Sequence, residues 1–302
     1  MQQVSKDFRN FLDPAFVSKL SSLELKARLV VEGFMVGLHK SPYHGFSVEF
    51  SEHRAYMQGD NLKDVDWKVF GKTEKFFIKQ YEEETNLRSY IFLDTSNSMS
   101  FSSGKNISKL EYALTLSASL SYLMIHQQDA VGLTLYAEKI NKFIPPKSSR
   151  GYLQEILKNL SLAKASEKTN TAAALNEAAE KINRRGLVII ISDLFDDINS
   201  VLKALKHFRY NKNEVIVFQI LDPLEKTFAF GKDAVFRDLE SNEEMTTQPY
   251  QIQNAYKEAM IEFTGRIKTE CLNANIDYNL IETSSPYDKA LLNYIQKRGR
   301  LY

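Results

Sequence analysis

Residues 87–98 read LRSYIFLDTSNS, a short apolar run followed by an acidic loop that is rich in hydroxyl groups. The run from Leu87 to Leu93 has the length and the aromatic and aliphatic content of a buried strand. Asp94 follows it directly, and Ser96 and Ser98 add two hydroxyls at alternate positions of the same loop. The segment therefore predicts a buried strand that ends in a cluster of oxygen atoms.

The rest of the chain alternates between helical and strand-like segments. Apolar residues recur at helical spacing over residues 109–126, 152–160, 171–183, 198–208, 252–274 and 287–297. Strand-like segments cover residues 130–136, 139–144, 187–191, 214–221 and 276–281. Pro145 and Pro146 are expected to end the second of these strands. The alternation predicts an α/β fold: an open, mostly parallel sheet with helices on both faces.

The first 85 residues have a different pattern. A helix is expected over residues 22–34, and the stretch from Gly37 to Phe50 suggests short strands and turns. We therefore predict two units. Residues 1–85 form an N-terminal helix and a β-rich extension, and residues 86–302 form the α/β domain.

Composition narrows the class of partner. The 302 residues include 39 basic and 38 acidic side chains, so the net charge of +1 does not favour nucleic acid as a partner. Cys271 is the single cysteine, which rules out an intrachain disulfide. The apolar runs are too short to span a bilayer, and the N-terminus does not resemble a signal peptide. We expect a cytoplasmic protein whose association with a membrane, if any, arises through partners.

Three strand-end loops offer oxygen ligands. Thr169 precedes the helix that starts near residue 171, and Asp193 follows the strand 187–191. The carboxyl ends of parallel strands meet at one edge of a sheet, where ligands of such sheets bind. Mg²⁺ and Mn²⁺ prefer oxygen ligands and keep some water. We therefore predict a divalent-cation site formed by Asp94, Ser96, Ser98, Thr169 and Asp193, some of them acting through water.

The same residues allow other interpretations. Asp94 or Ser96 could simply cap a helix. A metal-assisted hydrolase would need a general base, for which the sequence offers Asp193 or the pair Asp196–Asp197. That pair is better explained as acids at the N-terminus of the helix 198–208. A scaffold with a metal-free loop is a third reading. No catalytic residue is assigned, and any ATPase activity is expected to belong to a partner.

Two motifs identify a family resemblance. The pattern Asp94-x-Ser96-x-Ser98, with Thr169 and Asp193, resembles the metal-ion-dependent adhesion site of von Willebrand factor A domains. The segment from Arg54 to Trp67, with its Gly59-Asp60 and Asp66-Trp67 pairs, resembles the bacterial domain-of-unknown-function family fifty-eight. Residues 82–84 and the Asp129-x-x-Gly132 pattern add to this likeness. Lys63 and Lys168 depart from the family pattern, which often has arginine and glycine there.

The resemblance implies a von Willebrand factor A-like fold and a role in binding proteins. Members of this family are often associated with MoxR-type AAA+ ATPases in the assembly or activation of client proteins. By this analogy the metal site would bind an acidic residue of a client or of the ATPase. The analogy is one of fold and motif, and it assigns no chemistry by itself.

Overall fold

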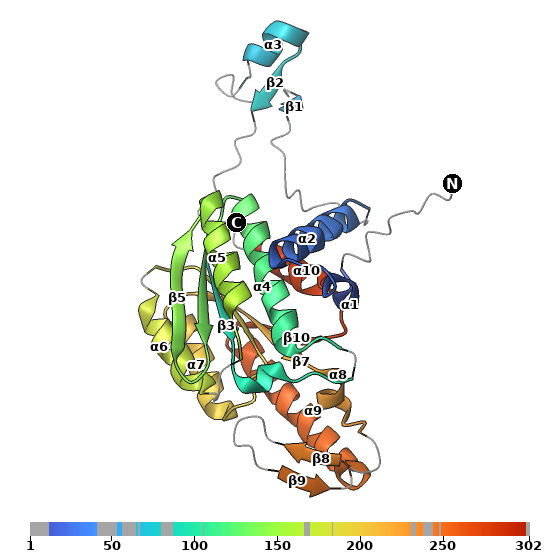
Figure 1. The fold of residues 1–302 in the computed structure, drawn as a ribbon. Coiled ribbons are helices and arrows are strands. Elements are labelled where there is room, and N and C mark those ends of the chain that lie inside the picture. The colour runs from blue at the N-terminus through green and yellow to red at the C-terminus, as the bar shows by residue number, and fades with distance from the viewer. Residues whose placement is uncertain are drawn as a thin grey trace, which may run out of the picture.

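The computed structural model describes residues 12–40, 53–55, 65, 67–79, 87–104, 106–165, 170–182, 184–230, 234–237, 244–247 and 249–299. Its centre is a six-stranded sheet with the strand order β10-β7-β6-β3-β4-β5 (Figure 1). The strands are β3 (Arg88–Asp94), β4 (Ala130–Tyr136), β5 (Ile140–Lys147), β6 (Leu187–Ser192), β7 (Glu214–Leu221) and β10 (Asp277–Glu282). All neighbouring strands pair in parallel except β5, which runs antiparallel to β4. The predicted α/β class is confirmed.

Helices cover both faces of this sheet, as predicted. Alternate strand residues pack against α2 (Leu23–Lys40), α4 (Lys109–His126), α5 (Arg150–Leu162) and α10 (Asp288–Arg298) on one face. The remaining strand residues pack against α6 (Thr171–Lys181), α7 (Ile198–Tyr210) and α9 (Pro249–Asn273) on the other. All six residues of β6 are buried, because a central parallel strand has a helical layer on each side.

The predicted end of β5 is wrong. The strand continues through Pro145 and Pro146 to Lys147. β5 is the outermost strand, so a proline whose N–H position faces away from β4 costs no hydrogen bond to a further strand. The two prolines also lie at a register shift, between the pairs Leu133–Ile144 and Val131–Lys147, where the regular pairing with β4 is interrupted. The pairing between β4 and β5 also shifts register twice, between Val131 and Leu133 and between Leu135 and Tyr136.

The N-terminal part is more helical than predicted in the residues that the structure describes. Residues 37–40 continue α2, and residues 41–50 of the expected strand-and-turn stretch lie outside the described residues. The other elements there are α1 (Pro14–Val17), β1 (His53–Ala55), α3 (Trp67–Thr73) and β2 (Phe77–Lys79). Val30 and Phe34 of α2 belong to the same core as α4. The boundary near residue 85 stays a prediction, but α2 packs as part of the α/β domain.

Three smaller elements complete the description. The helix α8 (Pro223–Thr227) follows β7, and β8 (Ala234–Arg237) and β9 (Glu244–Thr247) form an antiparallel pair. In the described part of the chain, no helix combines the length and the apolar character that a bilayer-spanning segment needs.

Candidate metal centre

Asp94 lies at the carboxyl end of β3, in the middle of the sheet, and its side chain is fully buried. Its Oδ1 accepts a hydrogen bond from the backbone N–H of Ser96 at 2.8 Å, and its Oδ2 accepts one from the hydroxyl of Ser192 at 2.7 Å. These two bonds fix the orientation of the carboxylate. No cationic side chain of the described residues forms an ion pair with it, so its charge is held by neutral donors alone.

Ser96 and Ser98 lie on the loop that follows β3. Residues Asn97–Ser100 form one turn of 3₁₀ helix, and Ser96 stands at its N-cap position without making a side-chain capping bond. The hydroxyl of Ser96 instead lies 3.0 Å from the hydroxyl of Ser98. The structure thus brings Asp94, Ser96 and Ser98 together and contradicts the reading of Ser96 as a helix-capping side chain.

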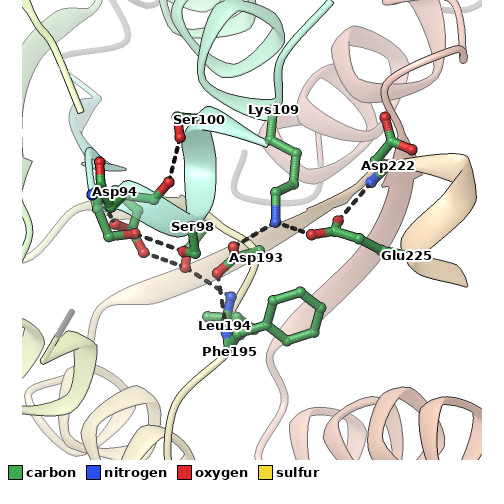
Figure 2. Close-up of polar contacts among 12 residues, drawn as sticks. Asp94, Ser98, Ser100, Lys109, Asp193, Leu194, Phe195, Asp222 and Glu225 are labelled. Atoms are coloured by element: carbon green, nitrogen blue, oxygen red, sulfur yellow. Dashed lines mark hydrogen bonds and ion pairs between the residues drawn. The ribbon is translucent and has the colours of Figure 1, made fainter. Parts of the chain in front are cut away.

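Asp193 lies at the end of the neighbouring strand β6, but both of its carboxylate oxygens are engaged by the protein (Figure 2). Its Oδ2 accepts a hydrogen bond from the ammonium of Lys109 at 2.7 Å, and its Oδ1 accepts one from the backbone N–H of Phe195 at 3.1 Å. Lys109 is itself fully buried and lies 4.9 Å from the centre of the Phe195 ring. Because its Oδ2 is paired with a buried ammonium, which repels a metal ion, Asp193 is better suited to act on a bound cation through water than as a direct ligand.

Glu225 is the second carboxylate on Lys109, with 2.6 Å between the ammonium and Oε1. The other oxygen of Glu225 accepts a hydrogen bond from the backbone N–H of Asp222, which caps α8. Asp222 also accepts a hydrogen bond from the backbone N–H of Ser103, 3.0 Å away. In Figure 2 the linked side chains of Asp193, Lys109, Glu225 and Asp222 extend to the start of α8, away from Asp94.

The electrostatic environment of Asp94 differs from that of Lys109 and its two carboxylate partners. Burial, and then the negative charge of Asp193, raises the pKa of Asp94 to about 7. Burial opposes the charged form of Lys109, but the charges and hydrogen bonds of Asp193 and Glu225 outweigh it and raise the pKa of Lys109. Lys109 thus shares one positive charge between two carboxylates. Asp94 pairs with no cation of the described residues, and its raised pKa means that the cation-free protein holds a proton there in part near pH 7.

The predicted ligand Thr169 lies outside the described residues. Its neighbour Asn170 caps α6 by accepting a hydrogen bond from the N–H of Ala173, and its own N–H points to the carbonyl of Ala137. The N–H of Ala172 points to Asp196, 3.4 Å away. The start of α6 therefore meets the carboxyl edge of the sheet, close to β4 and to the loop after β6.

The oxygen set fits a hard cation. In the part of the chain that the structure describes, no three His, Cys, Asp or Glu side chains gather as a metal cluster. A cation held here would need hydroxyl ligands. Asp94, Ser96 and Ser98 supply them from one loop. Tyr136, the partner of Asp94 in the register of β4, adds a buried hydroxyl without a hydrogen-bond partner. A buried, uncompensated carboxylate beside three hydroxyls is a donor set suited to Mg²⁺ or Mn²⁺.

Sequence reasoning missed Lys109 and Glu225, although both leave a signal. Lys109 is the first residue of α4, where a positive charge opposes the helix dipole. Such a lysine calls for a local acidic partner. Asp222-Pro-Leu-Glu225 has the spacing of a capping box, which marks Glu225 as a fixed side chain. By contrast, Asp197 caps α7 by accepting a hydrogen bond from the N–H of Ser200, as the sequence predicted.

Comparison with known proteins places this chain in a family. The uncharacterized protein Rv1480 of Mycobacterium tuberculosis and the uncharacterized protein Mb1516 of Mycobacterium bovis are each 25% identical to it over 234 residues. Each match covers 76% of this chain and 72% of the relative.

Among solved structures, the conserved hypothetical protein BatB from Bacteroides thetaiotaomicron is 20% identical, with a TM-score of 0.46. That match covers 71% of this chain and 99% of BatB. The SpRpn10 VWA domain is 10% identical with a TM-score of 0.41, covering 70% of this chain and 95% of that domain. The family model described as "Protein of unknown function DUF58" matches residues 52–263, most of the chain. The chain therefore belongs to the DUF58 family.

Proposed function

We propose that this protein is a binding module that holds a divalent cation at Asp94, Ser96 and Ser98 and uses it to capture an acidic residue of another protein. The buried, uncompensated carboxylate of Asp94 carries the proposal. A bound Mg²⁺ or Mn²⁺ would supply open coordination positions for a carboxylate from outside the chain. Ser192 and the N–H of Ser96 orient Asp94 for this role.

The engaged state of the other acids favours binding over hydrolysis. A metal-assisted hydrolase needs a carboxylate that is free to take a proton from water. Asp193 and Glu225 are both held by Lys109. Asp196 accepts a hydrogen bond from the N–H of Asp197, and Asp197 caps α7. Each of these acids already has a structural role. Asp94 is the proposed ligand because its oxygens accept only from neutral donors and pair with no cation in the described residues.

The resemblance to the family suggests the kind of partner. We propose that the acidic residue belongs to a MoxR-type AAA+ ATPase or to a client protein that the two assemble or activate together. The ATPase would supply the energy, and this chain would supply a cation-dependent contact. Thr169 is included as a proposed ligand, and Asp193 as a proposed ligand through water.

The partner proposal is tested by co-purification with and without Mg²⁺. Wild-type protein is expected to retain an AAA+ ATPase in Mg²⁺, identified by mass spectrometry, and to release it in EDTA. Ser96→Ala removes a hydroxyl of the site and is expected to lose the ATPase in both buffers. Ser100→Ala is the matched control, because Ser100 lies on the same turn and, among the described residues, its hydroxyl donates to the carbonyl of Asn97. Recovery of the same proteins by wild type and Ser96→Ala, or in Mg²⁺ and EDTA, would contradict the proposal.

A further inference from the structure

The strand β10 forms one edge of the sheet and has regular, proline-free geometry. All six of its residues pair in register with β7. Thr283 continues this pairing by donating its N–H to the carbonyl of Leu221 at 3.0 Å. Backbone groups alternate along a strand, so residues 277, 279 and 281 also face β7, and Tyr278, Leu280 and Glu282 direct theirs to the outer edge. The carbonyl of Glu282 accepts a hydrogen bond from the N–H of Ser285 at 2.8 Å, at the end of the strand. Within the described part of the chain, no hydrogen bond is recorded on the outward backbone groups of Tyr278 and Leu280.

The two edges of the sheet are protected very differently. The opposite edge strand, β5, contains Pro145 and Pro146 and two register shifts, which are common ways to prevent another strand from pairing. None of these features occurs in β10. An edge that is left regular while the other is blocked can accept a further strand.

A groove follows this open edge between α9 and α10. It has a volume of about 460 Å³ and is lined by residues of β10, α9 and the start of α10. Leu280 is 36% exposed and Ile261 is 71% exposed, so apolar surface is available beside the backbone groups. The hydroxyl of Tyr278 donates to the side chain of Gln219, which holds the Tyr278 ring in place at the groove. An extended segment of about six residues would match the ~20 Å length of β10.

The charged side chains that line the groove indicate which kind of extended segment would bind there. Lys268 of α9 and Lys289 of α10 line the groove, which has no acidic lining residue. Both lysines are exposed, and in the described residues neither forms an ion pair. Their charges are therefore available to an incoming chain, and they favour acidic side chains at its two flanks.

We propose that the outer edge of β10 binds an extended acidic segment of a partner protein, which adds to the sheet as a seventh strand. Main-chain hydrogen bonds to Tyr278 and Leu280 supply affinity, as in other strand-addition complexes. Lys268 and Lys289 supply the preference for acidic side chains. This surface is separate from the Asp94 loop, so the proposal does not depend on cation binding.

The test begins with a displayed library of random hexapeptides selected on the full chain in EDTA. The selected peptides are expected to be rich in Asp and Glu. Leu280→Pro removes an outward N–H that β7 does not use, and it is expected to weaken their binding roughly tenfold while the unfolding temperature stays close to wild type. Lys268→Glu/Lys289→Glu is expected to weaken binding roughly fivefold or more, with the effect shrinking as salt is added.

The matched control reverses two exposed lysines away from the groove. Lys142 lies on the opposite edge strand and Lys203 on α7, and Lys142→Glu/Lys203→Glu is expected to bind the peptides like wild type. The proposal is overturned if no hexapeptide is selected. It is also overturned if Leu280→Pro and Lys268→Glu/Lys289→Glu both bind the peptides like wild type. A wild-type dimer that Leu280→Pro converts to monomer would assign the edge to a second copy of the chain and overturn the proposed partner.

Discussion

Replacing Lys109 by methionine is expected to lower the free energy of unfolding by about 3–5 kcal/mol. The ammonium of Lys109 is fully buried between Asp193 and Glu225, at 2.7 and 2.6 Å. Methionine keeps most of the length of the side chain but leaves two carboxylates without their counter-charge. Removing one partner from a buried ion pair is costly because the remaining charge cannot return to water. Urea unfolding followed by circular dichroism measures the change.

Two further variants separate the loss of charge from the loss of packing. Lys26 pairs with Glu111 at 3.0 Å in a more open setting, with 13% and 40% of the two side chains exposed. Lys26→Met is therefore expected to cost no more than about 1 kcal/mol. Adding Glu225→Gln to Lys109→Met removes one of the two stranded charges and is expected to recover part of the loss. A Lys109→Met variant as stable as Lys26→Met would show that the buried cation is not needed.

The cation-free protein is expected to lose stability as the pH rises from about 4 to about 7 because of Asp94. Burial, and then the charge of Asp193, raises the pKa of Asp94 from 3.8 to about 7 in the folded state. Between these values the folded protein keeps a proton that the unfolded chain releases. The stability associated with this proton is therefore present at low pH and is lost as the pH approaches the folded pKa. Each pH unit within the window removes about 1.4 kcal/mol at most.

Asp94→Asn isolates this contribution, since asparagine keeps the shape of the side chain but does not titrate. Unfolding free energies are measured in EDTA near pH 5 and near pH 7 for both proteins. Groups far from Asp94 titrate alike in both proteins, so the difference between the two unfolding free energies reports on Asp94 and its immediate neighbours. We expect the unfolding free energy of Asp94→Asn to increase relative to that of wild type as the pH rises. A difference that stays constant across the two conditions would show that Asp94 carries no unfavourable buried charge.

The fold could be read from the sequence because most of its strands are buried on both faces. Such strands leave continuous apolar runs, and the residues of β4 and β7 were predicted with the bounds that the structure has. Edge strands carry weaker signals. Pro145 and Pro146 look like a strand end in the sequence, but an edge strand tolerates them at a register shift, where the regular hydrogen bonds to the neighbouring strand are interrupted. The strand order itself depends on packing between distant segments, which local patterns do not encode.

The candidate site could be predicted only in part. The alternation of Asp94, Ser96 and Ser98 is local, so the sequence shows the loop directly. The pairing of Lys109 with Asp193 joins residues that are 84 positions apart. It changes how Asp193 can contribute to the proposed cation site. Tyr136 was missed for the same reason: it meets Asp94 only through the register of β3 and β4. Electrostatic partners that lie far apart in the chain are the part of a site that a single sequence predicts least well.

The most direct test of the proposed centre is calorimetric titration of Mg²⁺ and Mn²⁺ into wild type and Asp94→Ala. Asp197→Asn is the control, because Asp197 is an exposed carboxylate of a nearby loop and asparagine also caps helices. The account predicts that wild type and Asp197→Asn bind the cation alike and that Asp94→Ala loses roughly a hundredfold or more in affinity. Equal affinity in wild type and Asp94→Ala would contradict it.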